Sequence, residues 1–73
     1  MGGIMPVALN GGNEAAVAAF LKERIPFGGI AEVNARVLEE TPYAPVACVE
    51  DVYEADRAAR VLAEKAIERL TAR

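Results

Sequence analysis

The chain has 73 residues, a formal net charge of −3, one cysteine and no histidine. Its length allows one small domain, spanning residues 1–73, and its acidic balance argues against the concentrated basic face that nucleic-acid binding requires. A single cysteine excludes an internal disulfide. Without histidine, the common metal-ligand sets and the Cys–His catalytic pair cannot form.

The sequence shows neither a membrane span nor a secretion signal. No apolar run approaches the roughly 18 residues that a transmembrane helix needs. The N-terminus lacks a charged segment followed by an apolar core. We therefore expect a soluble cytoplasmic domain with no membrane or nucleic-acid partner. A chain of this size buries only about 60% of the surface that it exposes when unfolded, so we expect it to associate with itself or with a larger protein.

The first predicted helix runs from Asn13 to about Glu23, with Asn13 as its N-cap. Pro26 ends it, because proline lacks the N–H and disfavours helical geometry in the preceding residue. Upstream, Pro6 could sit in the first turn of a helix, where its missing N–H costs nothing. Gly11 and Gly12 cost about 2 kcal/mol relative to alanines, so the sequence leaves open whether a helix continues through them or its first turn is frayed or broken. The apolar stripe has the three-to-four-residue spacing of one buried face and consists of Val17, Phe20, Leu21 and Ile25.

The second predicted helix runs from about Gly29 to Glu40, with Gly28 as its N-cap. Residues 41–45 end it, because two prolines in four residues cannot continue a helix. Its apolar stripe consists of Ile30, Val33, Val37 and Leu38.

The third predicted helix is the longest, from about Val49 to Ala72. Asp56 and Arg60 stand four residues apart and are expected to pair on its surface. Its stripe is rich in alanine, which allows close packing, and consists of Val52, Ala55, Ala59, Leu62, Ala66 and Leu70. No strand is predicted, so the expected fold is all-α, a small three-helix bundle.

Neither the Gly-Gly pairs nor the tyrosines of this chain indicate nucleotide or nucleic-acid binding. The Gly-Gly pairs at 2–3, 11–12 and 28–29 follow no predicted strand, which a phosphate-binding loop needs. We therefore expect these pairs to form turns or close backbone contacts. Tyr43 and Tyr53 are too few for a base-stacking platform.

Asn10, Asn13 and Glu14 form a polar group beside apolar residues. They could hold a ligand amide or a metal. The structural interpretation is favoured, with Asn13 capping the helix while Asn10 and Glu14 bond to neighbouring backbone at a domain junction.

The acidic residues Glu50, Asp51 and Glu54 could be taken for a hard-metal site. However, Glu50 and Asp51 point in different directions on a helix, and the Asp-rich calcium loop is missing. A solvated first helical turn is the favoured interpretation. Cys48 is expected to be a helix cap or a small core residue, since no histidine is present to activate its thiol. We therefore predict no catalytic, cofactor-binding or metal-binding residue in this chain.

Three segments carry a resemblance to a known family. They are Leu9-Asn10-x-x-Asn13-Glu14-x-x-Val17-x-x-Phe20-Leu21, Ile25-x-Phe27-x-x-Ile30 and Glu50-Asp51-Val52-x-x-x-Asp56-x-x-Ala59-Arg60. In this order and spacing they resemble the C-terminal helical domain of 1-deoxy-D-xylulose 5-phosphate reductoisomerase, over nearly the whole chain. The family usually has small non-glycine residues at positions 11 and 12 and a polar cap before the second helix, and this chain departs from both.

The resemblance implies that the chain is a fragment of a four-helix structural domain. The family's enzyme converts 1-deoxy-D-xylulose 5-phosphate to 2-C-methyl-D-erythritol 4-phosphate in isoprenoid biosynthesis, using NADPH and Mg²⁺ or Mn²⁺. Its cofactor, metal and phosphate sites lie in upstream domains, so no such residue is carried over to this chain. The implied role is to brace the upstream catalytic domain. The isolated fragment is expected to be inactive and, with apolar surface uncovered, to form a homo-oligomer.

The alternative is a free-standing helical module that binds a partner helix or self-associates through its apolar stripes. An independent enzyme is disfavoured, because the sequence offers no paired catalytic groups and little volume for a pocket.

Overall fold

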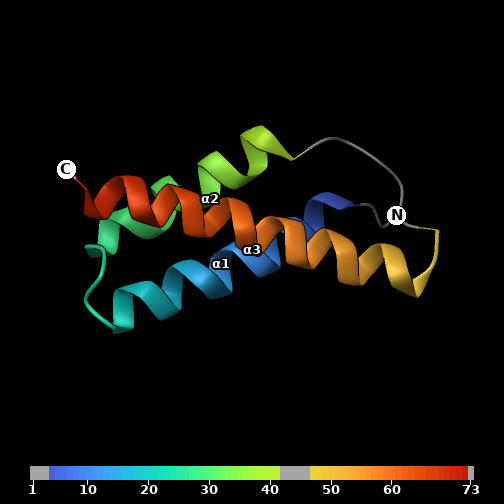
Figure 1. Cartoon of the computed structure of the whole chain (residues 1–73), viewed down its shortest axis with the longest axis horizontal. Helices are drawn as coiled ribbons and strands as arrows, with labels where there is room; N and C mark the ends of the chain where they lie inside the picture. Colours follow the sequence, from blue (N-terminus) through green and yellow to red (C-terminus); the bar gives the residue numbers. More distant parts are fainter. Residues whose placement is uncertain (1–3, 42–46, 73) are drawn as a thin grey trace.

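The computed structural model describes residues 4–41 and 47–72, and the described residues form three α-helices and no strand. The helices are α1 (Ile4–Leu21), α2 (Phe27–Glu40) and α3 (Val49–Thr71). In Figure 1, α1 and α3 run in the same direction and α2 returns in the opposite direction. Each helix packs against the other two. The prediction of an all-α three-helix bundle is confirmed.

The first helix continues through the glycine pair, which answers the question that the sequence left open, and it begins nine residues before Asn13, the predicted N-cap. A Cβ atom on Gly11 would lie 2.5 Å from Asp56 Oδ1, and one on Gly12 would lie 3.2 Å from both Val37 methyl carbons. Both glycines are buried. Gly11 lets α1 approach α3 closely, and Gly12 lets α1 approach α2 closely. This close packing offsets the low helix propensity of the two glycines. Asn13 lies inside α1 and is not an N-cap.

The turn between α1 and α2 has the hydrogen bonds of a Schellman motif. The Arg24 N–H donates to the Ala19 carbonyl at 2.8 Å, and the Glu23 N–H donates to the Phe20 carbonyl at 2.9 Å. Glu23 takes the left-handed conformation that this motif requires, with φ 61°. The first helix therefore ends at Leu21, two residues before the predicted end.

The second helix also begins earlier than predicted. Pro26, in an extended conformation with φ −74° and ψ 167°, is the N-cap residue, and the helix starts at Phe27. The predicted N-cap, Gly28, lies inside the first turn. Proline fits here because the first turn leaves backbone N–H groups without helical partners in any case.

Replacing Glu23 with glycine is expected to stabilise the chain by about 0.5–1 kcal/mol. Glycine adopts a positive φ without the steric penalty that a Cβ atom brings, although it also gives the unfolded chain more freedom. Thermal unfolding followed by circular dichroism should show a melting temperature several degrees higher. Glu23→Ala is the control, because it removes the carboxylate and keeps the Cβ atom. Equal melting temperatures for the two variants would contradict the prediction.

Small residues dominate the core. The largest fully buried side chains are Ile67, Val33 and Val37, and the remaining core residues are Ala8, Ala16, Ala19, Ile25, Ala59, Ala63 and Ala66. The predicted burial of Val33 and Val37 is confirmed. The narrow spacing that alanine and glycine permit between the helices leaves larger side chains at the margins of the interfaces.

Two predicted stripes are partly wrong. In α1, Leu21 is 72% exposed, while the alanines on the adjacent face are buried. In α3, Val52 is 37% exposed, while Ala63 and Ile67, which the predicted stripe lacked, are buried. The buried face of α1 is therefore rotated away from Leu21 toward the alanines, and that of α3 away from Val52 toward Ala63 and Ile67.

Candidate functional site

An ion-pair network joins α1 to α3. Arg60 donates from Nε to Asp56 Oδ2 at 2.8 Å and from Nη2 to Glu14 Oε1 at 2.6 Å. These hydrogen bonds, the one to Asp56 first, raise the pKa of Arg60. The predicted Asp56–Arg60 pair is confirmed, whereas the prediction that Glu14 bonds to neighbouring backbone is wrong. These three charges satisfy one another, so the network stabilises a helix contact and leaves none of the three as a free acid or base.

The two asparagines of the predicted polar group do not converge. Asn13 Oδ1 accepts a hydrogen bond at 3.0 Å from Asn34 Nδ2, which joins α1 to α2. The other amide atom of this partner, Asn34 Oδ1, is buried without a hydrogen bond. Asn10 lies on the exposed side of α1. Asn13 therefore contacts α2, Glu14 contacts α3 and Asn10 lies at the surface, so the three side chains do not converge on a common ligand.

The acidic residues at the start of α3 act locally. Asp51 Oδ2 accepts a hydrogen bond from the Ala47 N–H at 2.9 Å. This bond, with a contribution from Cys48, lowers the pKa of Asp51. Cys48 occupies the N-cap position and is exposed, so it is a cap residue and not a core residue. Within residues 4–41 and 47–72, no group of three or more acidic or thiol side chains could hold a metal ion.

The glycine pairs that the structure describes lie inside helices. Gly28 has open space beside it, whereas Gly29 is buried, and a Cβ atom there would meet Ile25 at 3.2 Å and Leu70 at 3.3 Å. The expectation of close contacts is therefore confirmed for Gly11, Gly12 and Gly29. The pair at 2–3 and Tyr43 lie outside the described residues, and Tyr53 is 66% exposed.

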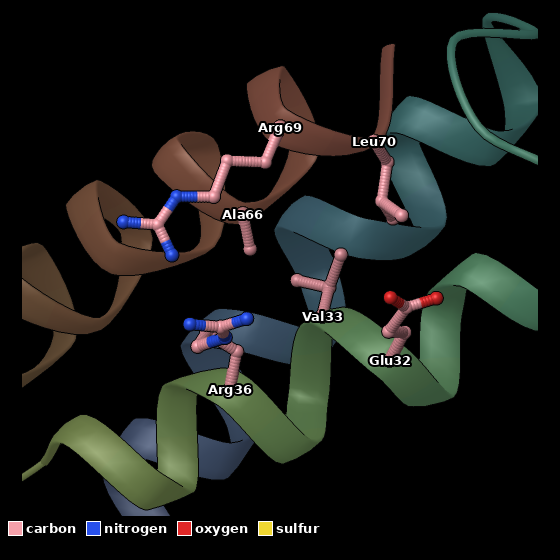
Figure 2. A pocket seen from close by; sticks show the side chains of 6 residues that line it. All are labelled: Glu32, Val33, Arg36, Ala66, Arg69 and Leu70. Carbon is pink, nitrogen blue, oxygen red and sulfur yellow. The ribbon is translucent and has the colours of Figure 1, made fainter. Parts of the chain in front are cut away.

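A narrow cleft separates α2 from α3 (Figure 2). Arg36 and Arg69 stand at one end of it and Glu32 at the other, over a floor that includes Val33 and Ala66. Its volume of about 20 Å³ is enough for a water molecule and far too small for a nucleotide or a sugar phosphate. The cleft offers no substrate pocket.

A larger apolar surface lies between the first half of α1 and the first half of α3. We call it the α1–α3 groove. It consists of a hollow of about 380 Å³ between the two helices and an adjoining hollow of about 430 Å³ that is lined by α1 alone; the two share Pro6 and Asn10. Together they are lined by Pro6, Val7, Leu9, Asn10, Asn13, Val52, Tyr53 and Asp56. A concentration of exposed apolar side chains of this kind is typical of an interaction surface.

The groove was not predicted from the sequence, because its apolar members come from positions about 45 residues apart that only the fold brings together. Leu9 is 45% exposed and Tyr53 66% exposed. The Arg24–Glu64 ion pair, with Nη2 2.6 Å from Oε2, was missed for the same reason. No local spacing signals either feature.

The described helices include none that is long and apolar enough to cross a membrane. The described residues also do not fit the cofactors that the resemblance implies. They provide no acidic cluster for a divalent metal, and their glycine pairs do not form the strand-to-helix turn of a dinucleotide site. No chemical step through either group can therefore be derived from this chain.

Comparison with known proteins gives a consistent result. Residues 1–62 match the sequence model of the family described as DXP reductoisomerase C-terminal domain. The 1-deoxy-D-xylulose 5-phosphate reductoisomerase of Dechloromonas aromatica (strain RCB) is 48% identical over 66 residues, which is 90% of this chain and 17% of that protein. The enzyme of the same name from Cupriavidus necator is 43% identical over 72 residues, 99% of this chain and 18% of that protein. No solved structure matches.

A third relative, the 1-deoxy-D-xylulose 5-phosphate reductoisomerase of Anaeromyxobacter sp. (strain K), is 49% identical over 67 residues, 92% of this chain and 17% of that protein. The chain thus spans less than a fifth of the length of these relatives. The segment that matches the family model covers α1, α2 and the first part of α3. The chain belongs to the family of the C-terminal domain of 1-deoxy-D-xylulose 5-phosphate reductoisomerase.

Proposed function

We propose that these 73 residues brace the catalytic part of a cytoplasmic 1-deoxy-D-xylulose 5-phosphate reductoisomerase and are inactive alone. Two findings support this proposal. Nearly the whole chain matches less than a fifth of each relative, and the family that it matches is described as a C-terminal domain. In this proposal the rest of the enzyme binds 1-deoxy-D-xylulose 5-phosphate, NADPH and a divalent metal and performs the reduction. The comparisons do not favour the free-standing module.

The α1–α3 groove is the surface that we assign to this contact. Leu9 and Tyr53, which are 45% and 66% exposed, lie within it. Burying such side chains stabilises a contact by about 25 cal/mol for each Å² of apolar surface. The neighbouring carboxylates of Glu14 and Asp56 both pair with the Arg60 guanidinium, so the three side chains together carry one negative charge. The surface therefore offers its partner mainly apolar contact with a paired polar rim, which suits a lasting contact within one polypeptide.

The contribution of the bundle to catalysis would be mechanical. Its three helices pack around one apolar core, and the Arg60 network, the Asn13–Asn34 hydrogen bond and the Arg24–Glu64 pair add polar contacts between elements. A rigid body that docks on the catalytic part limits the movement of the segments it touches. Loss of that support misplaces reacting groups, and misplacement by about 1 Å can lower a rate about 100-fold.

A chimeric enzyme tests the proposal. In it, the matching segment of the Dechloromonas aromatica enzyme is replaced by this chain, and NADPH oxidation is measured with 1-deoxy-D-xylulose 5-phosphate. We expect an active chimera. Val52→Asp, which places a charge in the groove, should lower the activity and the melting temperature, with an activity loss of about tenfold or more. Val61→Asp is the matched control, because Val61 lies on α3 outside the groove and is 50% exposed.

The two variants separate docking from folding. Circular dichroism of the 73-residue chain carrying each substitution shows whether the bundle itself still forms. An inactive chimera with a folded bundle, or equal activity of the Val52→Asp and Val61→Asp chimeras, would contradict the proposed role of the groove.

A further inference from the structure

A second groove lies on the other side of α3, beside the last turn of α2. We call it the α2–α3 groove. It has a volume of about 520 Å³ and is lined by Glu40, Glu54, Arg57, Ala58, Val61 and Leu62. Val61 is 50% exposed and Ala58 is exposed, so apolar atoms lie open along the middle of the helix. This groove shares no residue with the α1–α3 groove.

Four charges along this side of α3 are ordered, while a fifth, Arg57, lines the groove at the edge of the stripe beside Glu54. Steps of three, four or eight residues place the side chains of one stripe on the same side of a helix. On this stripe, Glu50 and Glu54 lie before the apolar centre, and Lys65 and Arg69 lie after it. Within the described part of the chain none of these four side chains has an ion-pair or hydrogen-bond partner. On the opposite flank of α3, by contrast, Asp56 and Arg60 are paired.

We infer that the isolated chain forms a dimer through the α2–α3 groove, with the α3 helices of two copies packed antiparallel. A twofold axis midway between Ala58 and Val61 brings each Ala58 opposite the partner's Val61. The small alanine allows the helices to approach, and the valine enters the groove of the other copy. Such a contact uses the same surface on both copies and closes as a dimer.

The same axis pairs the charges. Lys65 of one copy lies opposite Glu54 of the other, because both positions are equally far along the helix from the centre. Arg69 lies opposite Glu50 for the same reason. Each pair occurs twice, so these four charges of each copy gain a partner of opposite sign. A parallel arrangement would bring acid against acid and base against base, which selects the antiparallel one.

The inference is independent of the bracing role, since it concerns a different groove and the isolated chain. Sedimentation equilibrium from low micromolar to near-millimolar concentration should show a monomer–dimer equilibrium, and Val61→Asp should abolish the dimer. Lys65→Glu and Glu54→Lys should each weaken dimerisation roughly tenfold, because each turns two attractions into two repulsions. The double variant Glu54→Lys/Lys65→Glu should recover most of the wild-type affinity.

Lys22→Glu is the control for net charge. It makes the same change as Lys65→Glu in the turn after α1, where Lys22 interacts with Glu64 and with none of the four charges of the stripe, and it should leave the dissociation constant unchanged. Circular dichroism of every variant establishes that it is folded. The inference is overturned if the wild-type chain stays monomeric throughout the range, or if the double variant dimerises no more tightly than the single ones. It is equally overturned if Val52→Asp abolishes association while Val61→Asp does not.

Discussion

Replacing Ile67 with alanine is expected to remove most of the stability of the isolated chain. Ile67 is 1% exposed and is among the three largest fully buried side chains. Truncating a buried isoleucine to alanine costs about 2–5 kcal/mol, because the apolar contacts are lost and a cavity remains. The hydrophobic core of so small a domain rarely supplies more than about 3–5 kcal/mol of net stability. A large unfolded fraction is therefore expected at room temperature.

Urea unfolding followed by circular dichroism measures this loss. Ile67→Val should cost only about 0.5–1.5 kcal/mol, since it deletes one methylene group. Leu21→Ala is the control: it removes an apolar side chain of the same size from a position that is 72% exposed, so the unfolding free energy should change by less than about 0.5 kcal/mol. A cost for Ile67→Ala no larger than that for Leu21→Ala would show that the core does not lie where the structure has it.

The sequence predicts the number of helices and the limits of the third one well, because proline and periodicity are local signals. The predicted range from Val49 to about Ala72 agrees with the observed α3, Val49–Thr71. The Asp56–Arg60 pair was also predictable, since its spacing within one helix is enough to bring the side chains together.

Which side of α1 is buried could not be predicted in the same way. Periodicity gives most weight to large apolar residues and therefore selected Phe20 and Leu21. In the structure Ala16 and Ala19 are buried, while Leu21 is exposed. Burial here depends on how closely the helices approach, and small residues allow the closest approach while contributing little hydrophobic signal.

The candidate docking surfaces show a second limit. An exposed apolar side chain such as Tyr53 has no local signature, because hydrophobicity alone predicts burial. The roles of Asn13 and Glu14 likewise depend on partners in other helices, Asn34 and Arg60. From the sequence, both side chains were expected to hydrogen-bond to neighbouring backbone, because only nearby backbone groups can be inferred from sequence spacing. Tertiary contacts therefore decided the roles of both residues.

Replacing Gly12 with leucine is expected to destabilise the chain by about 1–2 kcal/mol net, although leucine is the better helix former. A Cβ atom at this position would lie 3.2 Å from both methyl carbons of Val37, which is fully buried. A whole leucine side chain there would force α1 and α2 apart, and such overpacking outweighs the gain of about 1 kcal/mol in helix propensity.

Gly28→Leu is the matched control. Gly28 lies in the first turn of α2, and no heavy atom lies within 4 Å of the position that a Cβ atom would take there. The same exchange should therefore be neutral or stabilising by up to about 1 kcal/mol. Urea unfolding of the two variants thus separates packing from propensity. Adding Val37→Ala to Gly12→Leu should recover part of the loss, because the smaller partner makes room for the leucine. Equal stability of the two leucine variants would mean that α1 and α2 do not meet at Gly12, and the continuous first helix would then have no physical explanation.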